Sequence, residues 1–68
     1  MPHIALNMYP GRTEERKREL AEKLRDFLAE EMNMDKKHFT VSVKDIPAER
    51  WKEELAKVPP EEIFVEGE

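Results

Sequence analysis

The segment TEERKRELAEKLRDFLAEEM, residues 13–32, has the clearest structural pattern in the chain. Its apolar side chains recur every three or four positions, which is the repeat of an amphipathic helix, and charged side chains occupy the other side. Thr13 is a favourable N-cap, and Glu14 and Glu15 suit the positive end of a helix dipole. The pattern predicts a helix that ends near residue 32, with an apolar stripe formed by Leu20, Leu24, Phe27, Leu28 and Met32.

Alternating segments lie on both sides of this helix. Residues 2–9 place Ile4, Leu6 and Met8 on one side, and the Pro10-Gly11 pair ends the run. A second run after the helix alternates in the same way, and it separates Phe39, Val41 and Val43 from Thr40, Ser42 and Lys44. Alternation is the period of a strand. Strand, helix and strand in this order predict an α/β fold, a βαβ unit with parallel strands and a right-handed crossover.

The last third of the chain predicts smaller elements. Pro47 ends the second strand and favours a short helix, in which Trp51 and Leu55 are spaced i and i+4. Pro59-Pro60 closes this helix, and the apolar run at residues 63–65 can pair as a brief C-terminal strand. No linker or repeat interrupts the chain, so residues 1–68 are expected to form one domain.

Composition restricts the classes of protein to consider. A chain of 68 residues without cysteine has few means of stabilising a large core. Two strands under one helix also leave both sheet edges unpaired, so completion of the sheet by another copy is expected. Charged residues make up 41% of the chain and its net charge is -4, which argue against a membrane span and against nucleic acid as a partner. A cytoplasmic homo-oligomer is the simplest expectation.

The common catalytic and metal-binding motifs are absent, and attention falls on Pro2. An initiator methionine before a small residue is generally removed, which would leave Pro2 with a secondary amine. An ordinary α-amino group titrates at roughly 7.7 to 8.0, and apolar surroundings lower that pKa. Such an amine can act as a general base near neutral pH. On the dipeptide alone, the alternative that Met-Pro is an ordinary start of a chain is favoured.

Several segments together resemble the 4-oxalocrotonate tautomerase family. They are Pro2 at the start of a strand, YPGRTEERK (residues 9–17) before the long helix, TVSV (40–43), and IPAERW (46–51). The resemblance covers residues 2–52 without a gap and rests on the joint agreement of Pro2, Arg12 and Trp51. The start of the chain and residues 47–51 also resemble the dimeric branch that acts on phenylenolpyruvate-like compounds.

The resemblance implies an isomerase that interconverts enol and keto forms of a small acid without cofactor or metal. Pro2 would be the general base, Arg12 would bind a carboxylate or carbonyl of the substrate, and Trp51 would form an apolar wall. Thr40 occupies the position of a second arginine in the best-known members, and a hydroxyl supplies one hydrogen bond but no charge. The tail also lacks the glycine-rich hairpin of those hexameric members, so a dimer and a hexamer both remain open.

Strand geometry predicts that one chain cannot form this site alone. Pro2 and Arg12 stand at opposite ends of the first strand, roughly 25 Å apart at about 3.3 Å per residue. Antiparallel pairing of first strands from two copies would bring these residues together at a subunit interface. The alternative interpretation is a non-catalytic βαβ homo-oligomer that serves as a binding or assembly module.

Overall fold

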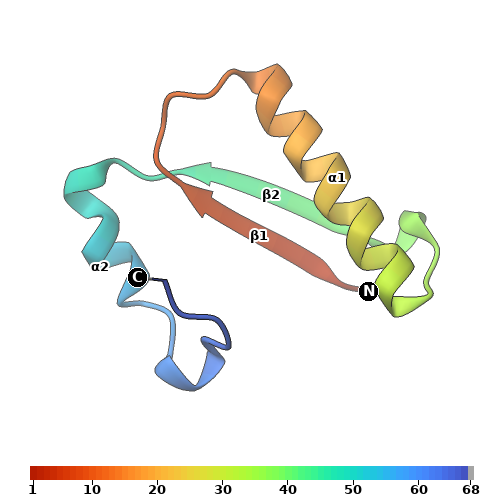
Figure 1. Ribbon diagram of the computed structural model, residues 1–68. Coiled ribbons are helices and arrows are strands. Elements are labelled where there is room, and N and C mark those ends of the chain that lie inside the picture. Colours follow the sequence, from red (N-terminus) through yellow and green to blue (C-terminus); the bar gives the residue numbers. More distant parts are fainter. Residues whose placement is uncertain (68) are drawn as a thin grey trace.

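The computed structural model describes residues 1–67, and it confirms the predicted α/β class. Helix α1 lies across one face of a two-stranded sheet, and helix α2 lies beyond the ends of the strands (Figure 1). The strands and helices in order are β1 (His3–Met8), α1 (Glu14–Met32), β2 (Thr40–Asp45) and α2 (Trp51–Leu55). Single turns of 3-10 helix occur at Lys36–His38, Ala48–Arg50 and Pro60–Glu62.

The two strands are parallel, and their register runs from His3 opposite Thr40 to Met8 opposite Asp45. Backbone hydrogen bonds continue past both ends of the ladder. The Thr40 amide donates to the Pro2 carbonyl at 3.2 Å, and the Ile46 amide donates to the Met8 carbonyl at 2.8 Å. Pro2 is therefore fixed beside the start of β2 by main-chain atoms alone.

The alternation expected from the sequence is confirmed on both strands. Ile4, Leu6 and Met8 are half-buried on the face toward α1, as are Val41 and Val43 of β2. The most buried side chains are Ala29, Phe39 and Ile46, at 4%, 7% and 2% exposure. The opposite face of the sheet is exposed, and it carries His3, Ala5, Asn7, Thr40, Ser42 and Lys44.

Helix α1 begins and ends at the predicted residues. The Thr13 hydroxyl accepts the Arg16 amide at 3.1 Å, which satisfies one of the free donors of the first turn. At the other end Asn33 adopts the left-handed conformation, with φ of 53°, and its amide returns to the helix carbonyls. Lys17 joins the first half of α1 to Asp45 at the end of β2 through a 2.8 Å ion pair.

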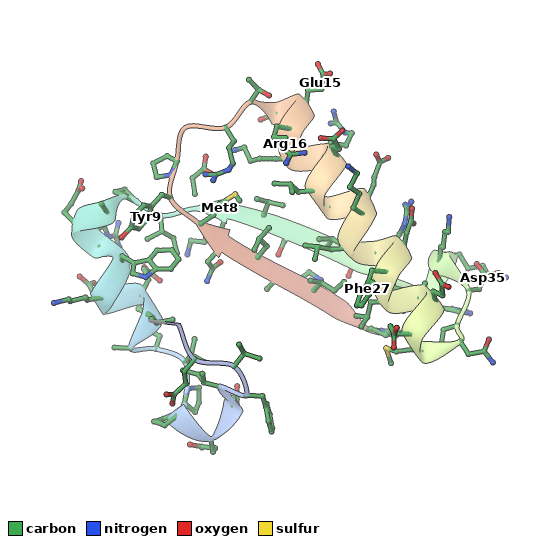
Figure 2. All side chains as sticks on the ribbon, in the orientation of Figure 1. Met8, Tyr9, Glu15, Arg16, Phe27 and Asp35 are labelled. Atoms are coloured by element: carbon green, nitrogen blue, oxygen red, sulfur yellow. The ribbon has the colours of Figure 1, made fainter. Side chains whose placement is uncertain are left out.

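The apolar stripe of α1 is only partly covered by the sheet. Leu20, Leu24 and Leu28 are half-buried, whereas Phe27 is 65% exposed and Met32 is 46% exposed. Phe27 belongs to the half of α1 that lies over the start of the strands (Figure 2). One chain thus leaves part of its own apolar surface in water.

The short second helix is confirmed and the C-terminal strand is not. Pro47 precedes the turn Ala48–Arg50, which leads directly into α2. Residues 63–65 were predicted as a possible strand, but they form none in the single chain, and Phe64 and Val65 are 92% and 88% exposed. A strand needs a neighbouring backbone to pair with, and the tail turns back toward α2, away from the sheet (Figure 1).

None of the helices in residues 1–67 combines the length and the apolar composition that crossing a membrane requires.

Candidate active site

The residues expected to form a site fall into two groups at opposite ends of the sheet. Pro2 and Thr40 lie at the amino ends of the strands, and Arg12 and Trp51 lie beyond the carboxyl ends. Strand β1 has 6 residues, which at about 3.3 Å each separates the groups by roughly 20 Å. The single chain brings Pro2 and Thr40 together but keeps both away from Arg12.

The amino-end group contains two residues that the sequence analysis did not assign to the site. The Nδ1 atom of His3 lies 2.7 Å from the Thr40 hydroxyl, and its Nε2 atom lies 3.2 Å from the Ser42 hydroxyl. All three side chains belong to the exposed face of the sheet. Alternation alone places them on one face, but only the register of the strands shows that His3 stands opposite Thr40.

Pro2 itself is half-buried, and Met1 before it is 92% exposed. While Met1 is attached, the Pro2 nitrogen is a tertiary amide without a basic lone pair. Met1 lies outside β1 and is exposed, so an aminopeptidase can reach it without unfolding of the sheet.

Arg12 owes its position to the turn after β1. Gly11 adopts φ of +123°, a conformation that residues with a side chain rarely adopt. The turn lets the exposed Arg12 side chain fold back, so that its Nη1 donates to the Tyr9 carbonyl at 3.3 Å. The guanidinium group therefore lies against the carboxyl end of β1.

An aromatic pair stands beside Arg12. The rings of Tyr9 and Trp51 are 5.0 Å apart and meet edge to face at 85°. Figure 2 shows Tyr9 at the end of β1, next to α2. Tyr9 is 50% exposed and Trp51 is half-buried, so the pair forms a firm apolar surface that solvent or a ligand can reach. Trp51 and Leu55 also line an open hollow against residues 62–67 of the tail.

Arg12 differs from the cations that surround Glu54 at this end of the sheet. Glu54 pairs with Lys57 at 3.2 Å, Arg50 at 3.5 Å and Lys44 at 3.9 Å. The hydrogen bond from Lys57, with the charges of these three cations, lowers the pKa of Glu54 from its usual range. Arg12 forms no ion pair within residues 1–67. Its charge is available to an anion.

Within the described part of the chain, no group of three or more His, Cys, Asp or Glu side chains gathers in a way that could hold a metal ion.

The fold and this site define a class of small βαβ proteins in which a proline opens the first strand and an unpaired arginine follows it. Residues 2–54 match the family model described as Tautomerase enzyme, so the chain belongs to the tautomerase family. It is also 31% identical to a "Probable tautomerase" of Xylella fastidiosa (strain 9a5c) over 55 residues, which cover 81% of this chain and 67% of that protein. No solved structure matches the chain significantly.

Proposed function

We propose that this protein is a cofactor-independent isomerase that interconverts the enol and keto forms of a small 2-keto acid. The single observation that carries the proposal is the family match, which begins at Pro2 and includes Arg12 and Trp51. The lack of a carboxylate partner for Arg12 in residues 1–67 supports it, because a free guanidinium group suits an acid substrate.

Pro2 is the proposed general base once Met1 has been removed. Its secondary amine takes the proton from the 2-hydroxyl group of the enol and returns a proton to carbon, so the keto product forms with no net change in composition. Apolar surroundings disfavour the charged ammonium form and lower the pKa of such an amine, which keeps it neutral and basic at working pH. The ring fixes the nitrogen at the start of β1.

Arg12, Trp51 and Thr40 bind the substrate in this proposal. Arg12 holds the carboxylate, ideally through two parallel hydrogen bonds. Trp51, braced by Tyr9, provides the apolar wall. Thr40 donates a hydrogen bond to the oxygen at which negative charge develops when the enol proton leaves.

Two copies are required to assemble one complete site. We propose that the free edges of β1 from two chains pair in antiparallel fashion, which places Pro2 of each copy beside Arg12 of the other. The unpaired edge of β1 and the exposed Phe27 support this arrangement, since both leave surface that a single chain does not cover. The dimer is the smallest assembly that meets the requirement.

The decisive experiment controls the state of the Pro2 nitrogen. The chain is produced with a short N-terminal extension that a protease removes to leave Pro2 as the first residue. Ketonisation of phenylenolpyruvate and 2-hydroxymuconate is followed by ultraviolet absorbance before and after cleavage. We expect activity only after cleavage, because cleavage converts an amide nitrogen into an amine.

Circular dichroism and sedimentation before and after cleavage provide the control, since neither should change. Cleaved, folded protein that turns over neither acid would contradict the proposal. It would favour the alternative of a non-catalytic oligomeric module, for which the uncharged Thr40 is the supporting observation.

A further inference from the structure

The exposed face of the sheet carries a chain of three polar side chains next to Pro2. His3 from β1 lies between two residues of β2, with Thr40 at 2.7 Å from Nδ1 and Ser42 at 3.2 Å from Nε2. Both ring nitrogens are thus engaged by hydroxyl groups. Neither His3 nor Ser42 has a role in the proposed function.

The direction of these hydrogen bonds decides what Thr40 can do. A neutral imidazole has one N–H donor and one acceptor, so one hydroxyl donates to the ring and the other accepts from it. If Ser42 donates to Nε2, the Nδ1–H group of His3 donates to Thr40, and the Thr40 proton stays free for a substrate oxygen. In the reverse direction the Thr40 proton is bound to His3 and cannot reach a substrate.

We propose that His3 is a positioning residue that orients and polarises the Thr40 hydroxyl, and that Ser42 fixes the required tautomer of His3. The inference rests on the proposed function. It explains how the neutral Thr40 assists the reaction at a position where the best-known members of the family have a charged arginine. Successive hydrogen bonds polarise one another, so Thr40 becomes a stronger donor to the developing oxyanion. Its amide meanwhile stays bound to the Pro2 carbonyl at 3.2 Å, beside the base.

Kinetics of processed protein test whether His3 acts through Thr40. His3→Ala, Thr40→Val and the double variant are compared on phenylenolpyruvate. Removal of one oxyanion donor commonly lowers kcat by about 10²–10³, and for this exposed site we expect roughly tenfold or more, with little change in KM. The double variant should be no slower than Thr40→Val alone. Losses that multiply in the double variant would overturn the inference.

Two further variants separate orientation from mere packing. His3→Asn keeps an N–H donor near the position of Nδ1, so it should recover much of the kcat that His3→Ala loses. Asn7→Ala changes another residue on the same strand and face, and it should leave kcat unchanged. Equal losses in His3→Asn and His3→Ala, or a loss in Asn7→Ala, would count against a specific role of His3.

A spectroscopic measurement is independent of turnover. ¹⁵N NMR of the imidazole ring, with the ring neutral, should show the tautomer protonated at Nδ1, and Ser42→Ala should shift the population toward the other tautomer. A ring protonated at Nε2 in the unmodified chain would overturn the inference. If cleaved protein has no activity, the proposed function fails together with the catalytic use of Thr40, while NMR still decides the direction of the hydrogen bonds.

Discussion

Single residues determine where the polar groups of this small fold point. Pro2 drew attention because removal of Met1 would give it a free amine, whereas Arg12, Trp51 and Thr40 were assigned to the site through the resemblance to the tautomerase family. The contact between His3 and Thr40 could not be predicted, because it depends on the register of the two strands, which alternation within each strand does not determine. The link from Arg12 to the Tyr9 carbonyl likewise depends on the torsion of one glycine.

Gly11 provides a prediction at this scale. A side chain at φ of +123° is strained although the space around the position is open. Gly11→Ala should therefore lower the free energy of unfolding by about 1–3 kcal/mol and raise KM for the acid substrate, because the turn that places Arg12 must change. Urea denaturation and steady-state kinetics measure the two effects. Gly67→Ala, also in open space, is the matched control and should change neither.

Arg12 provides a second prediction. Arg12→Ala should lower kcat/KM by about tenfold to a hundredfold, because hydrogen bonds to charged groups are worth about 1.5–3 kcal/mol. Arg12→Lys should recover only part of the loss, since an ammonium group cannot make the bidentate contact. Arg18→Ala alters another exposed arginine that forms no ion pair in residues 1–67, and it should leave kcat/KM unchanged. A similar loss in both alanine variants would argue against a role of Arg12 in binding.

At the scale of elements, local signals in the sequence were sufficient to predict where an element begins wherever a cap or a proline marks that boundary. Thr13 begins α1 and Pro47 leads into the turn before α2, as expected. The possible C-terminal strand does not form in the single chain, because an apolar run indicates that a segment favours burial but does not show that a neighbouring strand is present. Residues 63–65 have no strand beside them in one chain.

The ion pairs of α2 give the fold a predictable response to acid. Because the folded-state pKa of Glu54 lies below its ordinary value, its contribution to stability is complete above the unfolded-state pKa and is lost as pH falls through the folded-state pKa. Glu54→Gln should therefore flatten the acid side of the curve of stability against pH. Urea midpoints at a series of pH values from neutral to acid test this, with the exposed Glu53→Gln as control. Identical acid slopes in wild type and Glu54→Gln would contradict the prediction.

The ion pair of Lys17 leads to the opposite prediction, a loss of stability at alkaline pH. The hydrogen bond with Asp45 and the charge of that residue raise the pKa of Lys17. Its contribution is complete below the unfolded-state pKa and is lost as pH rises through the folded-state pKa. Lys17→Met should remove this alkaline decline, which thermal denaturation at increasing pH can follow. Lys23→Met, on the same helix and without an ion pair in residues 1–67, should leave the decline in place.

At the scale of the whole molecule, the proposed sharing of one site between two chains would make activity a property of pairs of chains. One chain with an uncleaved N-terminal extension lacks the amine, and another with Arg12→Ala lacks the cation. When the two kinds of chain pair at random, about half of the dimers contain one chain of each kind. Each of these mixed dimers has one complete site of two. Mixing equal amounts, after reversible unfolding to exchange subunits, should restore about a quarter of the wild-type rate.

The controls are the two variants measured separately and the sum of those two rates. A mixture no faster than that sum would show that Pro2 and Arg12 do not share a site across chains. A dilution series of wild type gives an independent check, because the specific rate should fall as dimers dissociate.

The hydrogen bond from the Thr40 amide to the Pro2 carbonyl has a consequence for how such proteins change over time. The main chain at position 40 anchors the proposed base, while the side chain at the same position faces the proposed substrate. Any residue except proline can supply that amide. A single codon change at position 40 can therefore explore new substrate chemistry without displacing the base, which makes this position a ready point of functional divergence.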